Sequence, residues 1–307
     1  MSCNKKCHLI IENEVDKMKN KRILIIICVF LLIALNLVGC NTVENLNPVR
    51  KRLATNYNSY WVNEAIGVLE NGNLEYIPKI AFIDTGCSLE SDHIIYKYNV
   101  VSQNEDVEYN SEHGTLIMKE FFNLNRNASV LTIKVSDSEE NINENVFAQA
   151  INIAVEQKSD IIHISLGTSV DHKVIKEAIS RAIEKDIIVI ASSGNAGGEK
   201  LLYPAAYEGV ISVMARDINN LDIATNSKSK SKRSFSAPGE HIFVDEEYVT
   251  GTSIAAIYIT NAVSYIKARN VNITYNEIVE ILKKSCQYPT EYSYGMINYK
   301  KLQNNID

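Results

Sequence analysis

From residue 60 onward, short and uninterrupted apolar runs alternate with segments whose apolar residues recur every three or four positions. Such runs predict strands buried on both faces, and the intervening segments predict amphipathic helices. The predicted strands are residues 79–83, 130–135, 161–165, 187–191 and 210–214, and the predicted helices are residues 145–156, 173–185 and 276–284. Because strands joined by helical crossovers form parallel sheets, the sequence predicts a three-layer α/β fold with a mostly parallel central sheet and helices on both faces.

Residues 1–39 have the composition of an export signal. Three basic residues precede an apolar run, residues 23–38, which is shorter than the ~20 residues of a bilayer-spanning helix. The run ends at Leu37-Val38-Gly39-Cys40, which resembles the lipobox of bacterial lipoproteins. The resemblance implies cleavage before the cysteine and lipidation of its thiol, with an uncleaved membrane anchor as the alternative. Because Met18 begins a more typical signal, residues 1–17 are either a misassigned start or a cytoplasmic extension.

The rest of the chain divides into a linker and one domain. Residues 40–60 are polar and rich in asparagine, which favours a linker. Residues 61–303 contain no Pro-, Gly- or Ser-rich break and no internal repeat, so we expect a single domain there. A lipid on Cys40 adds ~0.8 kcal/mol of membrane affinity per buried CH₂. We therefore expect the domain to be lipid-anchored at the extracytoplasmic face of a bacterial cell membrane.

Charge and cysteine content exclude several classes of protein. With Lys+Arg 31 against Asp+Glu 37 the formal net charge is −6, whereas nucleic-acid binding requires a basic surface. Four of the six cysteines lie at or before position 40, so Cys87 and Cys286 alone cannot form a disulfide framework. We expect Cys87 to pack in the core and assign Cys286 no role. No HExxH motif or paired-cysteine spacing is present, so a metalloenzyme is not expected.

Short motifs with reactive side chains follow several predicted strands, at the positions where parallel sheets bind their ligands. In chain order the motifs are Asp84-Thr85-Gly86, Glu112-His113-Gly114-Thr115, Ser165-Leu166-Gly167, Ser193-Gly194-Asn195-Ala196-Gly197 and Gly251-Thr252-Ser253. Each motif alone has an ordinary structural explanation, because an aspartate at a strand end commonly forms a turn. Their combination and their order are therefore more informative than any one of them.

Together these motifs resemble the subtilisin-like serine proteases (subtilases, peptidase family S8), whose catalytic residues follow the order Asp, His, Ser. The resemblance extends over residues 61–302. It includes three further motifs, Tyr203-Pro204-Ala205-Ala206-Tyr207, Phe235-Ser236-Ala237-Pro238-Gly239 and Tyr294-Gly295-Met296-Ile297-Asn298. The resemblance implies a subtilisin-like fold, a catalytic domain at residues 61–303 and serine endopeptidase activity.

The resemblance also implies the residues of the catalytic machinery. His113 would take the proton of Ser253 and later return it to the leaving amine, while Asp84 would orient the imidazole. The side-chain amide of Asn195 and the backbone N–H of Ser253 would form the oxyanion hole.

A peptide substrate would bind along two edges. Ser165, Leu166 and Gly167 form one of them, and residues 137–142 form the other, as in strand addition to a sheet. The resemblance places Leu202 where subtilases form the floor of the primary pocket, which favours small or medium apolar P1 side chains. Three acidic residues near the second edge favour a basic residue elsewhere in the substrate through charge complementarity. They are Asp137, Glu139 and Glu140.

Three features depart from the family pattern. Ile257 stands where subtilases carry a proline four residues after the catalytic serine, and His163 stands where they often carry an asparagine. We expect His163 to be a packed or hydrogen-bonded strand residue, with tuning of the triad as the alternative. Residues 113–130 are too few for the calcium loop of secreted subtilases, so we predict no bound calcium and no other cofactor. The residues that this prediction concerns are Asn123, Asn125 and Asn127.

Residues 41–60 leave little room for the folded prodomain of secreted subtilases, and similarly compact subtilases remove leader peptides from lantibiotics. We therefore expect a monomeric, membrane-tethered serine endopeptidase whose partner is a peptide or propeptide substrate. Leader-peptide processing and broader surface or spore-related proteolysis both remain open. The alternatives are a catalytically silent relative that binds peptides or a partner at the same cleft, and a different hydrolase that uses the same triad.

Overall fold

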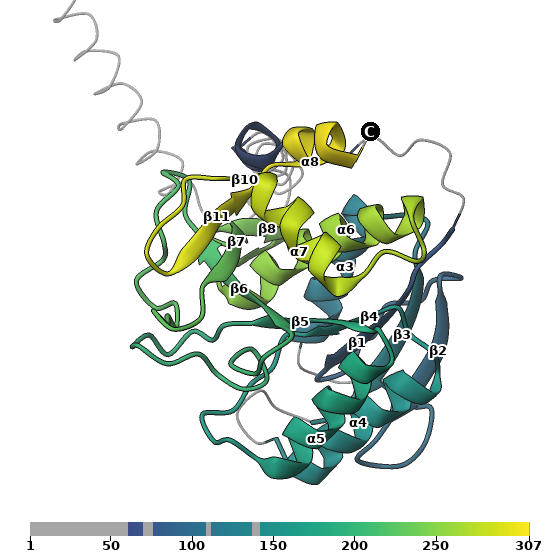
Figure 1. Ribbon diagram of the computed structural model, residues 1–307. Helices are drawn as coiled ribbons and strands as arrows, with labels where there is room; N and C mark the ends of the chain where they lie inside the picture. Colours follow the sequence, from purple (N-terminus) through teal and green to yellow (C-terminus); the bar gives the residue numbers. More distant parts are fainter. Residues whose placement is uncertain (1–60, 70–75, 109–111, 137–141, 307) are drawn as a thin grey trace, which may run out of the picture. The chain divides into compact units, whose positions relative to one another are not determined.

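The computed structural model describes residues 61–69, 76–108, 112–136 and 142–306, and a central sheet dominates them (Figure 1). The strand order of this nine-stranded sheet is β10-β11-β7-β6-β5-β4-β1-β3-β2, and all neighbours are parallel except β10 and β11. The strands are β1 (Lys79–Asp84), β2 (Ile94–Asn99), β3 (Ser129–Lys134), β4 (Ile161–Ile164), β5 (Ile188–Ser192), β6 (Val210–Arg216), β7 (Ser234–Pro238), β10 (Cys286–Gln287) and β11 (Ser293–Ile297).

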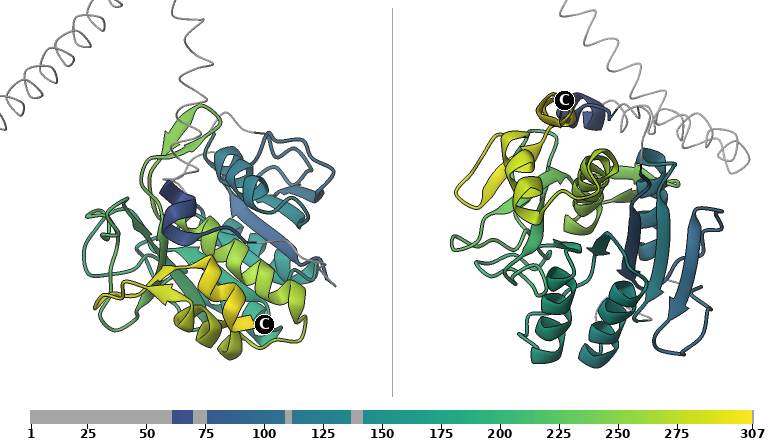
Figure 2. Two further views of the ribbon diagram at one scale, coloured as in Figure 1. Left: turned by 90° about the horizontal axis from the view of Figure 1, so that it is seen from above. Right: turned by 45° about the vertical axis from the view of Figure 1, so that its right-hand side comes forward.

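Helices cover both faces of the sheet, so the predicted three-layer α/β architecture is confirmed (Figures 1 and 2). One face carries α4 (Glu144–Glu156) and α5 (Lys173–Glu184). The other carries α3 (His113–Leu124), α6 (Thr252–Arg269), α7 (Tyr275–Lys284) and α8 (Tyr299–Ile306). Successive strand residues point to opposite faces, so Phe82 packs in the core around α6 whereas Ile83 packs in the core under α4 and α5. Both faces of each central strand must therefore be apolar, which explains the uninterrupted runs.

The central helix α6 crosses β4, β5, β6 and β7. Every residue from Thr252 to Ala268 is buried, so the helix is enclosed by protein on all sides. It begins at Thr252, directly after Gly251, and Ser253 is its second residue.

The predicted central strands and helices agree with the structure to within two residues at each end. The elements that the sequence did not predict are α3, β2, β7, the hairpin of β8 (Ile242–Val244) and β9 (Glu247–Val249), β10, β11 and α8. Most of these strands are short or lie at an edge, and β7 reads Ser-Phe-Ser-Ala-Pro, so none carries a long apolar run. Helix α8 ends at Ile306, three residues beyond the predicted domain boundary.

The predicted signal at residues 1–39, the linker at residues 40–60 and the lipidation site Cys40 lie outside the described residues. Within the ranges that the structure describes, no helix is both long enough and apolar enough to cross a bilayer.

Candidate active site

The reactive motifs converge because three of their strands are neighbours. β1, β4 and β5 are adjacent and parallel, so their carboxyl ends lie at one edge of the sheet. Asp84 ends β1, Ser165 follows β4, and Asn195 lies three residues after β5. The N-terminus of α6 brings Ser253 to the same edge, where its hydroxyl contacts Ser165.

Asp84 and His113 form a hydrogen-bonded pair. His113 is the first residue of α3, and its Nδ1 lies 2.8 Å from Oδ1 of Asp84. The same oxygen accepts a hydrogen bond from the backbone N–H of Thr85 at 2.7 Å. Helix α3 approaches the Asp84 loop so closely that a Cβ on Gly114 would lie 2.1 Å from the carbonyl oxygen of Gly86. Glycine at position 114 is therefore required for this contact.

The electrostatics of the pair favour an ionised aspartate. Burial acts to raise the pKa of Asp84, but the charge and hydrogen bond of His113 and the N–H of Thr85 outweigh it, so the pKa lies below its ordinary value. An ionised carboxylate can only accept, so Nδ1 of His113 carries the hydrogen. The other ring nitrogen, Nε2, is then the basic one, which is the tautomer that a general base requires.

Ser253 has its hydroxyl directed to the neighbouring strand end. Its Oγ donates to the backbone carbonyl of Ser165 at 3.0 Å. A hydroxyl has a single proton, so it donates either to this carbonyl or to His113. Proton transfer to His113 therefore requires the hydroxyl to turn away from Ser165. The position of Ser253 at the start of α6 places the positive end of the helix dipole beside its oxygen.

Asn195 is hydrogen-bonded to Thr252, the residue that precedes Ser253. Its Oδ1 accepts hydrogen bonds from the backbone N–H of Thr252 at 2.9 Å and from the hydroxyl of Thr252 at 3.0 Å. Both hydrogen bonds are accepted by Oδ1, and Nδ2 is the donor group of the same amide. A Cβ on Gly251 would lie 2.9 Å from Nδ2, and the φ of +152° at Gly251 also favours glycine there. Asn195 and Ser253 are thus brought together as an oxyanion hole requires.

Leu202 lies between the segments that follow β4 and β5. A Cβ on Gly167 would lie 3.0 Å from Cβ of Leu202, and a Cβ on Gly194 would lie 2.5 Å from its Cγ. The backbone N–H of Leu202 donates to Ser193 at 3.0 Å. The structure therefore brings Leu202 together with the predicted edge of Ser165, Leu166 and Gly167. Of the second predicted edge, residues 137–141 lie outside the described residues, and so do the three acidic residues on it.

His163 and Tyr258 are two residues whose neighbours could not be read from the sequence. His163 is fully buried, with Nδ1 2.8 Å from the hydroxyl of Thr260 and Nε2 2.6 Å from that of Ser165. Burial lowers the pKa of His163 to about 3, so the ring is neutral. The hydroxyl of Tyr258 donates to Glu120 at 2.7 Å, and burial raises the pKa of that glutamate. The departure from the family pattern at His163 drew attention to that residue, whereas no signal in the sequence marked Tyr258.

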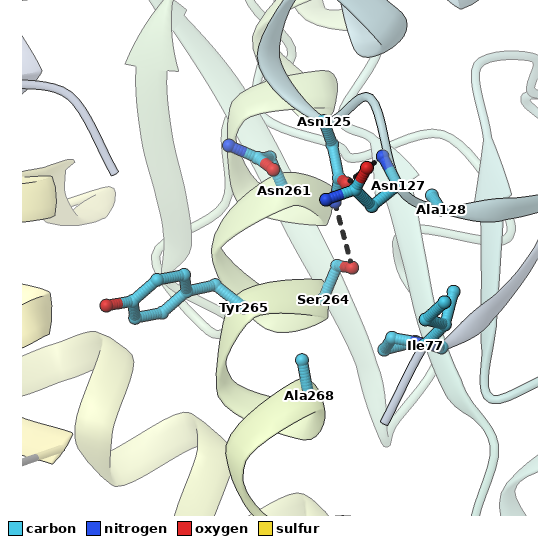
Figure 3. A pocket seen from close by; sticks show the side chains of 9 residues that line it. Ile77, Asn125, Asn127, Ala128, Asn261, Ser264, Tyr265 and Ala268 are labelled. Carbon is cyan, nitrogen blue, oxygen red and sulfur yellow. Dashed lines mark hydrogen bonds between the residues drawn. The ribbon is translucent and has the colours of Figure 1, made fainter. Parts of the chain in front are cut away.

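Of the three asparagines for which no calcium is predicted, Asn125 and Asn127 lie between α3, β3 and α6 (Figure 3). Asn123 belongs to α3 itself. Asn125 donates to the hydroxyl of Ser264 at 3.2 Å, and its Oδ1 accepts from the backbone N–H of Asn127. The amide of Asn123 donates to Glu120 at 3.2 Å. The amides of Asn123 and Asn125 are used in protein contacts. In the described part of the chain, no group of three or more His, Cys, Asp and Glu side chains could hold a metal ion.

Two cysteines lie in the described part of the chain, and both are poor nucleophiles. Sγ of Cys87 lies 3.5 Å from Sδ of Met118 in the core. Burial raises the pKa of Cys87, and it raises that of Cys286 to about 12. Since the thiolate is the reactive form, both stay inert at neutral pH. Ser253 is therefore the better candidate nucleophile at this edge of the sheet.

Comparison with known proteins identifies relatives of this domain. The chain is 29% identical over 245 residues to the minor extracellular protease Epr of Bacillus subtilis, a match that covers 72% of this chain and 38% of the relative. It is 32% identical over 219 residues to the major intracellular serine protease of the same organism, covering 62% of this chain and 68% of the relative. The match thus spans well under half of the first relative's length.

Solved structures show the same fold. The epidermin leader peptide processing serine protease (EpiP) of Staphylococcus aureus has a TM-score of 0.66 and 18% identity, with 81% of this chain and 80% of that chain covered. The protease domain of PatA also has a TM-score of 0.66, with 19% identity over 77% of this chain and 98% of that chain. At this identity the likeness concerns the fold. The subtilase family model matches residues 63–304, so the chain belongs to the subtilase family of serine proteases.

Proposed function

We propose that the protein is a serine endopeptidase that hydrolyses peptide bonds with Asp84, His113 and Ser253. The observation that carries this proposal is the 2.8 Å contact between Asp84 and His113 at the sheet edge where Ser253 begins α6. Family membership gives the same class of reaction. An ionised Asp84, a basic Nε2 on His113 and a Ser253 hydroxyl at a helix N-terminus support these roles.

In the proposed reaction, an extended peptide lies along Ser165, Leu166 and Gly167. The Ser253 hydroxyl turns from the Ser165 carbonyl to Nε2 of His113, transfers its proton there and attacks the scissile carbonyl. The negative charge that develops on the carbonyl oxygen is stabilised by Nδ2 of Asn195 and the backbone N–H of Ser253.

His113 then gives the proton to the leaving amine, and water completes the cycle by the same steps. Throughout, Asp84 stabilises the imidazolium by charge and holds the ring by its hydrogen bond. Each step uses residues of the protein alone, and we propose that activity requires no calcium or other cofactor.

The proposed substrate class is a leader peptide or propeptide. The compact domain is similar in fold to a structure described as a leader peptide processing protease, which supports this choice. The side chain of Leu202 between Gly167 and Gly194 limits the depth of the P1 pocket and favours small or medium apolar P1 residues. Broader surface proteolysis is the competing substrate class.

We further propose that the protein acts as a monomer at the extracytoplasmic face of a bacterial membrane. The apolar run at residues 23–38 and the lipobox-like cysteine at its end support a lipid anchor on Cys40. A peptide exported by the cell would reach the tethered domain without passing through bulk solution.

A second candidate, a catalytically silent peptide-binding relative, is favoured by one observation. The Ser253 hydroxyl donates to Ser165, and a domain that never turned it to His113 would bind peptides without cleaving them. Labelling of the full, detergent-solubilised chain with a fluorophosphonate separates the two. We expect labelling that is abolished by Ser253→Ala, whereas a folded protein with a cooperative thermal transition and no labelling would refute the enzyme and favour the silent relative.

A further inference from the structure

His163 lies at the centre of the site although it belongs to none of the catalytic roles above. It is the third residue of β4, and none of its side chain is exposed. Its ring packs on Phe82 of β1 with 4.8 Å between centroids. Phe82 is two residues before Asp84, so the imidazole rests against the strand that carries the aspartate.

Both ring nitrogens of His163 are used. Nε2 lies 2.6 Å from Oγ of Ser165, and Nδ1 lies 2.8 Å from Oγ1 of Thr260 on α6. A neutral imidazole has one donor and one acceptor nitrogen, and each hydroxyl can take either part, so all partners are satisfied whichever tautomer is present. The ring therefore connects the end of β4 to α6 through two buried hydrogen bonds.

Both connections lead to Ser253. Thr260 follows Ser253 by seven residues, almost two full turns, so the two residues lie on the same face of α6. Ser165, the other partner of His163, is the residue whose carbonyl accepts the Ser253 hydroxyl at 3.0 Å. One buried ring thus contacts β1, the end of β4 and α6, the three elements that carry Asp84, the substrate edge and the nucleophile.

We propose that His163 is a positioning residue that sets the orientation of Ser253 by holding Ser165 and α6 in register. His163 acts on the reaction through its hydrogen bond to the hydroxyl of Ser165, which holds Ser165 in place. The carbonyl of Ser165 in turn accepts the hydrogen bond of the resting Ser253 hydroxyl. Without that hydrogen bond, Ser165 can rotate, and the nucleophile loses its fixed starting position. This role rests on the proposed serine protease activity.

The test is a double-mutant cycle on the full-length protein, with the rate constant of fluorophosphonate labelling and the kcat of peptide cleavage as readouts. His163→Phe keeps the ring against Phe82 but removes both nitrogens, and Ser165→Ala removes one of its partners. We expect each single variant to label about 10- to 100-fold more slowly, because a lost hydrogen bond to an orienting group acts mainly on the chemical step. The labelling rate constant of the double variant should be within about twofold of that of the slower single variant, since both substitutions break the hydrogen bond between His163 and Ser165.

Ser212→Ala is the matched control, because it removes a buried hydroxyl that pairs with Ser234 at 2.9 Å in β6 and β7. It should lower the melting temperature and leave the labelling rate unchanged. The proposal would be overturned if Ser165→Ala were labelled at the wild-type rate. It would also be overturned if the labelling rate of the double variant fell by the product of the two single effects. If His163→Phe does not fold, His163→Asn replaces it, and Ser165→Ala still decides. A wild-type protein that is not labelled refutes the protease function itself, which is a distinguishable result.

Discussion

Replacing Leu202 by alanine should change which peptides are cleaved. The Leu202 side chain fills the space between Gly167 and Gly194, where a Cβ on either glycine would come within 3.0 Å of it. The same leucine lines a pocket of about 730 Å³ with Tyr203, Ala206 and other residues. Because Leu202 separates the two glycine segments, its truncation lengthens the P1 slot by the three carbons that leucine has beyond alanine.

The magnitude follows from the surface that a larger P1 residue would bury. Three additional carbons at ~0.8 kcal/mol each give roughly 2.4 kcal/mol if fully buried. Leu202 is half-buried, so the slot is partly open to water, and about 1–2 kcal/mol is a better expectation. The kcat/KM for a P1 leucine relative to a P1 alanine should therefore rise by roughly 5- to 30-fold in Leu202→Ala.

The assay compares two peptides that differ only at P1, for the wild-type protein and the variant, so that the ratio is independent of the active fraction. Leu124→Ala is the control, because it removes the same atoms from a half-buried leucine at the C-terminal end of α3. The control should leave the P1 ratio unchanged. An unchanged ratio in Leu202→Ala as well would refute the assignment of Leu202 to the P1 pocket.

Four further outcomes are expected. Asn195→Ala should lower kcat by about 10²–10³ with little change in KM, the loss seen when the corresponding donor is removed from a subtilisin; an unchanged kcat would exclude it from the oxyanion hole. Burial holds the pKa of His163 at about 3 against an ordinary 6.5, so the unfolded chain binds a proton that the folded chain does not, and stability falls as pH drops through this window. Urea midpoints measured across that range should fall less steeply in His163→Phe than in the wild type. Tyr258→Phe removes a hydrogen bond from buried Glu120 and should lower the free energy of unfolding by about 1–3 kcal/mol in urea titrations. The wild-type protein should incorporate a lipid label that Cys40→Ser abolishes, and a membrane-bound wild-type protein without the label would favour an uncleaved anchor.

The core of the fold was predictable because burial on both faces leaves a direct mark on the sequence. β4 and β5 are buried at every position between α6 and the α4–α5 layer, and apart from His163 and Ser192 their residues are apolar, so a nearly continuous apolar run results. β2 lies at the sheet edge with most of its residues partly exposed, and its sequence, Ile-Ile-Tyr-Lys-Tyr-Asn, contains no long apolar run. β7 is buried but contains Ser234 and Ser236, whose hydroxyls form hydrogen bonds with serines of the neighbouring strands β6 and β11. The sequence of β7 alone does not reveal these partners.

The residues of the candidate site were predictable from the sequence, whereas their hydrogen-bond partners were not. Asp84, His113, Asn195 and Ser253 lie in short motifs whose glycines and order are visible in one dimension. Their hydrogen-bond partners depend on how distant elements pack. The link from Tyr258 to Glu120 joins residues 138 positions apart, and local periodicity carries no information on such a pair.

Two buried polar contacts hold the helix α6. Tyr258 and Thr260 are two residues apart, about 200° around α6, so they face nearly opposite sides. On one side Tyr258 bonds to Glu120 of α3, the helix that begins with His113, and on the other Thr260 bonds to His163 of β4. The helix that presents the nucleophile is therefore held by a buried polar contact on each side, one leading to the base and one to the substrate edge. Since an unpaired buried group is costly, rotation of α6 that broke either contact would be opposed, and the two contacts together restrict the position of Ser253 relative to His113.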